Sequence, residues 1–169
     1  MADFQVKLND RKTLTNRSYI QDNMSDNKKT IITDGQDLAE KAAQLAAEGV
    51  TDVVITLNTL NYTRYKESND GKELGPVIEG INAAVGQKLH ITLNVSLKEG
   101  YNEAEILDLL QLTFQHKYDI VFMPTISYDL LRSKMPALKP IDGDFGDVEM
   151  FKYPGAVGRI GLMKGQKSN

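Results

Sequence analysis

The sequence of 169 residues contains no cysteine. Cysteine thiolates serve as nucleophiles, as redox pairs and as ligands of zinc and iron–sulfur clusters, so this chain supplies none of these groups itself. The absence of cysteine also fits a reducing compartment, and we expect a cytoplasmic protein. Hydrophobic residues make up 41% and charged residues 25% of the chain, which is typical of a globular protein that buries a core without disulfides.

An excess of basic residues is also missing. The formal net charge is −3 at pH 7, whereas proteins that bind nucleic acid carry a basic surface for the phosphates. The chain has no apolar run long enough to span a membrane, and "MADFQVKLNDRK" lacks the apolar core of a signal peptide. We therefore expect neither a nucleic acid nor a membrane as a partner.

The chain divides by pattern into two parts. Residues 1–27 are polar and weakly patterned, apart from "DFQVKLN", whose alternating apolar residues predict a short strand. In residues 28–169, short strands alternate with helices, which predicts one α/β domain with parallel strands and right-handed crossovers. The expected strands are "KTIIT", "DVVITLN", "HITLNVSL" and "DIVFM", followed by the pair "VEMFKY" and "GRIGLM" around Pro154-Gly155.

This pattern predicts an incomplete barrel. A closed barrel of eight βα units needs about 250 residues, which is more than this chain has. We expect about four parallel strands with helices on their outer face, and a C-terminal β-hairpin.

Helix boundaries are predicted from capping residues. Asp34 is expected to be the N-cap of the first helix, and Pro76 to lie in the first turn of a helix that ends near Gly86. Asn102, with Glu105 three residues later, predicts a capping box at the start of another helix. Two polar segments are expected to be irregular, the first of them with one helical turn: "NYTRYKESNDGKE" and "LRSKMPALKPIDGDFGD".

The expected strands carry polar residues where a sheet covered by helices on both faces would carry apolar ones. We expect these side chains at or near the strand ends, on one common side, with helices covering only the other side. Two interpretations are open: a small-ligand cavity floored by hydroxyls and amides, or a one-sided sheet whose polar face is merely solvated. The residues concerned are Thr33, Thr56, Asn58, Thr92, Asn94 and Ser96.

Other motifs are weaker indications of chemistry. The acidic stretch "DGDFGD" lacks the glycine position and closing glutamate of an EF-hand loop, so we expect a solvated loop rather than a metal site. "GAVGRIG" has the glycines of a phosphate-binding loop but no helix after it, so we expect part of a hairpin. No set of nucleophile, base and orienting residue is found.

Three segments together resemble a known family in order and spacing. "TIITDGQDLAEKAAQLAAEGVTDVVITLNTLNYTRY" is similar to a segment in which a "TTNG" strand end, a helix and a "VNVSLDSLD" strand follow one another. "VIEGINAAVGQKLHITLNVSLKEGYNEAEILDLL" and "MFKYPGAVGRIGLM" are similar to two later segments of the same family. That family is the molybdenum cofactor biosynthesis protein A (MoaA) family of radical S-adenosylmethionine GTP cyclases, and the resemblance runs from Lys29 to Met163.

The resemblance implies a radical-SAM type of fold with a site that this chain alters. The family's two iron–sulfur clusters need cysteine motifs that this chain lacks. Thr56 stands where a family serine contacts the methionine part of S-adenosylmethionine, Asn58 replaces an aspartate, and Asp34 replaces the "TTNG" asparagine. Thr92 replaces a lysine, whereas Asn94 matches the family, so the resemblance implies a ligand site without one of its charged contacts.

These observations favour a MoaA-like protein related to molybdopterin biosynthesis, truncated and non-catalytic, with a binding or partner role. We expect no cofactor bound by this chain, and S-adenosylmethionine or GTP only as vestigial ligands. Two alternatives stay open: a subunit whose partner supplies the clusters, and an unrelated α/β protein that binds a small molecule. An incomplete barrel leaves open sheet edges, so we expect residues 1–27, a homodimer or a partner chain to cover one edge.

Overall fold

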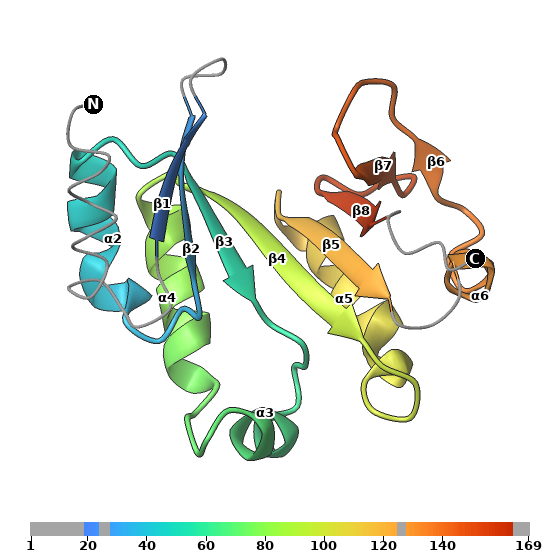
Figure 1. The fold of residues 1–169 in the computed structure, drawn as a ribbon, viewed down its shortest axis with the longest axis horizontal. Helices are drawn as coiled ribbons and strands as arrows, with labels where there is room; N and C mark the ends of the chain where they lie inside the picture. The colour runs from blue at the N-terminus through green and yellow to red at the C-terminus, as the bar shows by residue number, and fades with distance from the viewer. Residues whose placement is uncertain (1–18, 24–27, 125–127, 164–169) are drawn as a thin grey trace. The chain divides into compact units, whose positions relative to one another are not determined.

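The computed structural model describes residues 19–23, 28–124 and 128–163, which form a mixed α/β structure (Figure 1). They divide into two compact units, and the boundary falls within strand β4. The first unit contains residues up to Leu57 together with Asn61–Thr92. The second contains Asn58–Leu60 and the residues from Leu93 onwards.

The first unit is built from strands and helices in alternation. β1 pairs antiparallel with β2, with Tyr19 opposite Ile32, and β2 pairs parallel with β3, with Ile31 opposite Val53. The backbone N–H of His90, at the start of β4, donates to Thr51 O at 2.9 Å. The elements are β1 (Tyr19–Asn23), β2 (Lys28–Thr33), α2 (Leu38–Ala47), β3 (Asp52–Thr56), α3 (Tyr62–Ser68), α4 (Gly75–Gly86) and the first residues of β4 (His90–Leu97).

The helix boundaries of the first unit are partly as expected. Pro76 lies in the first turn of α4, and the helix ends at Gly86 as predicted. The prediction that Asp34 caps α2 is wrong, because the helix begins at Leu38 and Asp34 Oδ1 instead accepts from Gln36 N at 3.0 Å. A short acidic side chain that bonds its own backbone two residues later forms a turn in place of a cap. α3 has seven residues, so it is longer than the single turn expected.

The second unit contains the remaining strands in the order β4-β5-β8-β7-β6. β8 pairs parallel with β5, with Ile120 opposite Ile160, and antiparallel with β7, with Met150 opposite Gly161. The C-terminal hairpin is therefore confirmed, and β8 joins it to the parallel strands. Besides the rest of β4, the elements are the 3-10 turn η3 (Glu103–Glu105), α5 (Ile106–Gln115), β5 (Asp119–Pro124), α6 (Tyr128–Ser133), β6 (Lys139–Pro140), β7 (Val148–Lys152) and β8 (Arg159–Met163).

Two of these elements lie in a segment expected to be irregular. α6 begins just before "LRSKMPALKPIDGDFGD" and ends inside it, and β6 lies wholly inside it. β6 adds only two residues to the edge of β7. The expected strand in "DFQVKLN" lies outside the described residues. Within the described residues the sheet is mostly parallel with antiparallel C-terminal strands, and it does not close, so the α/β class with an incomplete barrel is confirmed.

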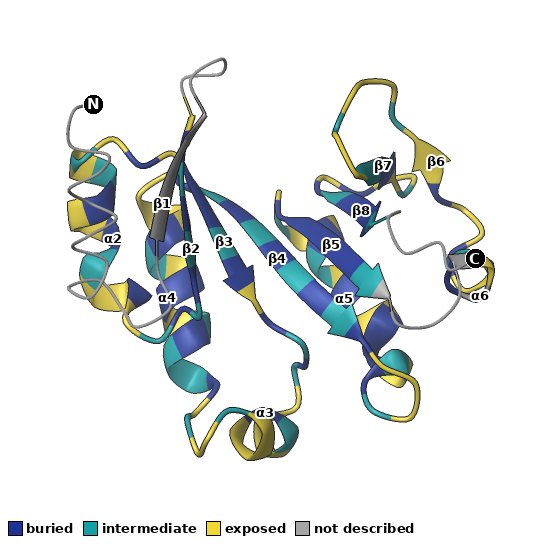
Figure 2. Cartoon of the chain, viewed as in Figure 1, coloured by how far each residue is buried: buried dark blue, intermediate teal, exposed yellow. Residues whose placement is uncertain are grey.

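Each unit buries apolar side chains beneath its helices (Figure 2). In the first unit α2 and α4 pack against each other, and Leu38, Leu45 and Val77 are all at most 2% exposed. In the second unit Leu109 of α5 and Phe122 of β5 are fully buried. None of the helices within the described residues is long and apolar enough to cross a membrane.

Gly158, the middle glycine of "GAVGRIG", allows close packing in the second unit. A Cβ atom on Gly158 would lie 2.9 Å from His116 O and would overlap Tyr118 O, both on the connection between α5 and β5. Gly158 N also donates to Thr113 O at 2.8 Å. The backbone reaches this connection only because no side chain intervenes. The expected hairpin is confirmed, and close packing requires the glycine at position 158.

The close approach of α4 to the turn before α2 gives a test of the first unit. A Cβ atom on Gly80 would lie 2.8 Å from Leu38 Cβ and 2.9 Å from Gly35 O, so we expect Gly80→Ala to lower the free energy of unfolding by about 1–3 kcal/mol. Gly86 in the same helix has no atom within 4 Å of the corresponding position, so Gly86→Ala is the matched control. We expect it to be neutral or to stabilise by up to about 1 kcal/mol, since alanine favours helices. Urea denaturation measures both, and equal midpoints would contradict the packing argument.

Candidate functional site

The residues predicted to line a ligand site divide between the two units. Those in the first unit are Thr33, Asp34, Thr56 and Thr92, and those in the second are Asn58, Asn94 and Ser96.

Thr33 does not lie on the polar side of its strand. It is only 3% exposed and shares the buried face of β2 with Ile31, because alternate residues of a strand point the same way. Its Oγ1 accepts from Gly35 N at 3.0 Å, which uses the hydroxyl to stabilise the turn after β2. The prediction that Thr33 faces the common polar side is therefore wrong.

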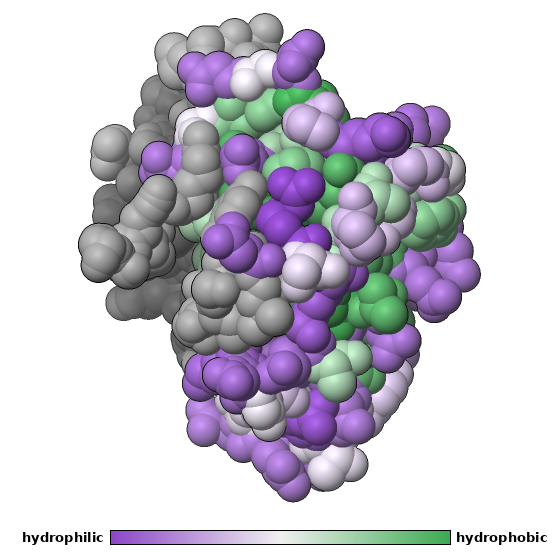
Figure 3. All heavy atoms as spheres, turned by 90° about the vertical axis from the view of Figure 1, so that its right-hand side faces the viewer, coloured by the Kyte–Doolittle hydropathy of each residue, from purple (hydrophilic) through white to green (hydrophobic). Residues whose placement is uncertain are grey.

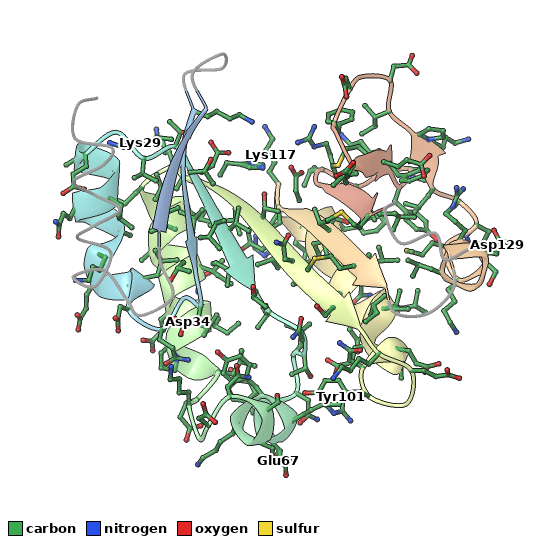
Figure 4. The ribbon with its side chains drawn as sticks, in the orientation of Figure 1. Lys29, Asp34, Glu67, Tyr101, Lys117 and Asp129 are labelled. Atoms are coloured by element: carbon green, nitrogen blue, oxygen red, sulfur yellow. The ribbon has the colours of Figure 1, made fainter. Side chains whose placement is uncertain are left out.

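Asp34 lies at the carboxyl end of β2, whereas Lys29 lies at the opposite end of the strand (Figure 4). Its Oδ2 is 3.4 Å from Lys72 Nζ, and the two side chains are 16% and 40% exposed. A partly solvated ion pair at this distance contributes less than about 1 kcal/mol to stability. Gln36 donates through Nε2 to Tyr65 Oη at 3.2 Å and to Glu73 O at 2.9 Å, which connects the turn to α3 and to the segment before α4.

The other two predicted residues of the first unit are threonines, Thr56 and Thr92. Thr56 ends β3 and is exposed, and Thr92 of β4 is half-buried. Neither hydroxyl has a hydrogen-bond partner within the part of the chain that the structure describes. Each is thus able to donate to or accept from a small molecule.

The second unit carries the three other predicted residues on one surface, which we call the polar floor: Asn58, Asn94 and Ser96. Residues of β4 alternate strictly between half-exposed and buried, so Asn94 and Ser96 point away from the core. Their side chains have no hydrogen-bond partner among the described residues. Asn58 Oδ1 accepts from Ser96 N at 2.8 Å, and none of the described residues accepts from its Nδ2 amide.

Asn102 supports the polar floor from the interior of the second unit, through hydrogen bonds to its backbone. It is fully buried, and its Nδ2 donates to Asn58 O at 2.6 Å and to Ser96 O at 2.9 Å. Its Oδ1 accepts from Lys98 N at 2.9 Å. The predicted capping box is wrong, since Asn102 makes no cap hydrogen bond and instead joins the end of β4 to the segment that follows β3.

Glu105, the other half of the expected capping box, also reaches back along the chain. Its carboxylate accepts from Thr59 Oγ1 at 2.6 Å and from Leu60 N at 2.8 Å, and the residue is 9% exposed. Hydrogen bonds to a charged group are stronger than those between neutral groups. Glu105 therefore holds the segment after Asn58 in place. No local pattern indicates this contact, because the partners are 45 and 46 residues apart.

A second charged contact of this unit joins β5 to β8. Arg159 donates from Nε to Asp119 Oδ1 at 2.9 Å and from Nη2 to Asp119 Oδ2 at 2.6 Å. This pair raises the pKa of the guanidinium above its ordinary value, chiefly through the hydrogen bond to Asp119. The same guanidinium lies over the Phe145 ring, 5.8 Å from its centroid. Both ends of the contact are engaged within the protein, which indicates a structural role.

The acidic loop before β7 forms a hollow of about 290 Å³, lined by residues between Pro140 and Phe151. Asp142 and Asp144 are exposed, and Asp144 Oδ1 accepts from Gly146 N at 3.1 Å in a local turn. Within the described ranges, no three His, Cys, Asp or Glu residues lie together as metal ligands would.

The surface seen from the side of β6 and α6 shows hydrophilic residues spread among hydrophobic ones (Figure 3).

Comparison with known proteins agrees with the resemblance found in the sequence. No family model matches the chain. It is 32% identical over 155 residues to a GTP 3',8-cyclase of Peptoclostridium acidaminophilum, covering 81% of this chain and 48% of that protein. GTP 3',8-cyclases of Alkaliphilus oremlandii (32% over 149 residues, 79% and 47% of the two chains) and Brucella ovis (31% over 97 residues, 57% and 28%) are also similar. The chain is a partial match to the MoaA family. It spans about half the length of the first two relatives.

The iron–sulfur clusters implied by this family do not fit the residues present. Cluster irons are held by cysteine thiolates, and the sequence contains no cysteine. Within the described part of the chain, no alternative group of three His or carboxylate ligands takes their place. What the MoaA-like chain does offer is the uncharged polar floor and the network that holds it.

The Glu105 contact gives a test of that network. Glu105→Ala leaves the Leu60 N–H and the Thr59 hydroxyl without their acceptor, so we expect a loss of about 2–3 kcal/mol in the free energy of unfolding. Glu79→Ala is the matched control, because Glu79 is exposed on α4, and we expect a change within about 0.5 kcal/mol. Chemical denaturation of both variants measures the difference. A Glu105→Ala variant as stable as the control would show that the buried carboxylate contributes nothing.

Proposed function

We propose that this chain is a binding protein of molybdenum cofactor biosynthesis that carries out no radical chemistry of its own. Its similarity to GTP 3',8-cyclases supports a relation to molybdopterin synthesis. The observation that carries the proposal is the absence of every cysteine from a chain that keeps the strands of the MoaA-like fold. Without thiolate ligands, this chain holds no cluster to deliver the electron that cleaves S-adenosylmethionine.

The ligand we propose is S-adenosylmethionine or GTP, bound by its uncharged polar groups. The polar floor offers amides and a hydroxyl that have no partner among the described residues, and such groups pair with carbonyl, hydroxyl and N–H groups. Thr92 stands where the resemblance places a lysine, so a cationic contact for a phosphate or carboxylate is missing there. The relatives are named for a reaction of GTP, which makes it the first probe.

A second candidate is a subunit that works with a cluster-bearing chain. Titration with S-adenosylmethionine and GTP, with and without a cluster-bearing chain, separates it from the first candidate. The edge-covering role of residues 1–27, a homodimer or partner chain at an open edge, and the cytoplasmic location stay predictions.

Isothermal titration of the chain with S-adenosylmethionine and with GTP tests the proposal. We expect at least one of them to bind with a dissociation constant of about 1 mM or lower, since the polar floor carries several groups that no described residue pairs with. Each titration is repeated with a cluster-bearing GTP 3',8-cyclase present. Tighter binding only in that mixture would favour the subunit, and no heat of binding under any condition would remove both candidates.

Asn94→Leu tests whether the polar floor contacts the ligand. The change keeps the size of the side chain and removes its amide, so we expect about tenfold weaker binding, equivalent to about 1.4 kcal/mol. Asn82→Leu is the control, because Asn82 is exposed on α4 in the first unit. Equal affinities of the two variants would mean that the floor is merely solvated.

A further inference from the structure

The sequence contains three Asp-Gly pairs, and the structure places them in three different environments. They are Asp34-Gly35, Asp70-Gly71 and Asp142-Gly143. An aspartate carboxyl lies within reach of the backbone nitrogen of the next residue, and a glycine there has no Cβ atom to hinder the approach. All three glycines have a positive φ, so the backbone region they occupy does not distinguish the pairs. What distinguishes them is whether the two reacting groups are already bonded elsewhere.

The first pair is protected by its contacts. Gly35 N donates to Thr33 Oγ1 at 3.0 Å in a buried hydrogen bond, and Asp34 Oδ1 accepts from Gln36 N at 3.0 Å. A Cβ atom on Gly35 would lie 3.1 Å from Val77 Cγ1, so α4 packs closely against this turn. Neither the nitrogen nor the carboxylate is available to the other.

The second pair is accessible to water, but its backbone nitrogen is bonded. Asp70 and Gly71 are both exposed, in the turn that follows α3. Gly71 N donates to Lys66 O at 3.0 Å. This hydrogen bond has to open before the nitrogen loses its proton and turns toward the carboxyl of Asp70.

The third pair is exposed and has no such protection. Asp142 and Gly143 lie in the acidic loop before β7, and both are exposed. Among the described residues, neither the carboxylate of Asp142 nor the N–H of Gly143 has a hydrogen-bond partner. Elsewhere in the same loop, Gly146 N donates to Asp144 Oδ1 at 3.1 Å, so the loop pairs a neighbouring amide and leaves this one unpaired within the described part of the chain.

We propose that Asp142-Gly143 is a site of spontaneous covalent modification, at which Asp142 isomerises to isoaspartate. The Gly143 nitrogen loses its proton to solvent and attacks Cγ of the protonated carboxyl. A C–N bond forms, a C–O bond breaks and water leaves, which closes a succinimide ring. Water then opens the ring at either carbonyl. Opening at Cγ restores aspartate, and opening at the main-chain carbonyl leaves the chain running through Cβ and Cγ as isoaspartate.

The reaction changes the hollow that this loop encloses. Asp142 and Gly143 are both among the residues that line the hollow of about 290 Å³. Isomerisation adds one carbon to the main chain and moves the free carboxylate onto Cα, so the path of the loop and the position of its charge both change. Water is the only other reactant, and the elemental composition of the product is unchanged. No ligand is needed, so this inference does not depend on the proposed function.

Incubation of the folded full chain in water enriched in heavy oxygen tests the inference. Each opening of a succinimide leaves one heavy oxygen on that aspartate. After transfer to ordinary water, cleavage after lysine and arginine places each Asp-Gly pair in its own peptide for mass spectrometry. We expect Asp142 to gain label about fivefold faster than Asp70, as the contribution of one hydrogen bond predicts, and Asp34 to gain label most slowly.

A denatured sample shows whether the fold causes the difference. The three dipeptides are identical, so we expect similar rates of labelling at all three in concentrated denaturant. Label at Asp142 that appears no faster than at Asp70 in the folded chain would overturn the inference. A preference for Asp142 that persists unchanged in denaturant would overturn the structural reason for it.

Two variants of the same exposed position test the succinimide itself. Asp142→Asn closes the same ring with loss of ammonia in place of water, so we expect faster reaction and the same pair of products, aspartate and isoaspartate. Asp142→Glu has one more methylene and would need a larger ring, so we expect no label at position 142. Chromatography separates the isoaspartyl from the aspartyl peptide. Label at the glutamate, or absence of the isoaspartyl peptide from aged wild type, would contradict the mechanism.

Discussion

The alternation of β4 is the constraint on which the rest of this structure depends. Ile91, Leu93, Val95 and Leu97 are at most 1% exposed, and each residue between them is half-exposed. Burial of each such side chain contributes about 1.5–3 kcal/mol. A shift of one residue in the register of this strand would turn all four side chains to the other face and lose this stabilisation. The strand is therefore stable in only one orientation, with these four side chains toward the core. The same alternation directs Asn94 and Ser96 away from the core.

The end of β4 presents a second problem, which the asparagine side chains solve. A backbone N–H or carbonyl near the core needs a hydrogen-bond partner, and a sheet normally supplies it from the neighbouring strand. At Ser96 the partners are side chains: Asn58 accepts from its N–H and Asn102 donates to its carbonyl. Side-chain amides carry the same donor and acceptor as the backbone, so they extend the pattern of the sheet beyond its last strand pair. A structural need thus produces a rigid polar surface.

The sequence predicts much of the fold, because strands and helices follow from local patterns. The period of two in β4, Pro76 at the start of α4 and the hairpin around Pro154-Gly155 are all visible in neighbouring residues. The errors have one physical origin: Asp34 and Asn102 are good capping residues that have other partners available. Asn102 bonds a residue 44 positions away, and no pattern of nearby residues reveals such a contact. Thr33 shows a further limit, since a hydroxyl at a strand end suits a buried turn as well as an open face.

The same network clarifies how binding and chemistry separate in a MoaA-like chain. Contacts that are equally strong before and during a reaction do not accelerate the chemical step. Reductive cleavage requires an electron donor held against the ligand, and that donor is a cluster whose thiolate ligands this sequence does not contain. The two functions thus depend on different residues. Asn58, Ser96 and Asn102 are held in place without any cysteine, because the hydrogen bonds among them join the end of β4 to the segment after β3.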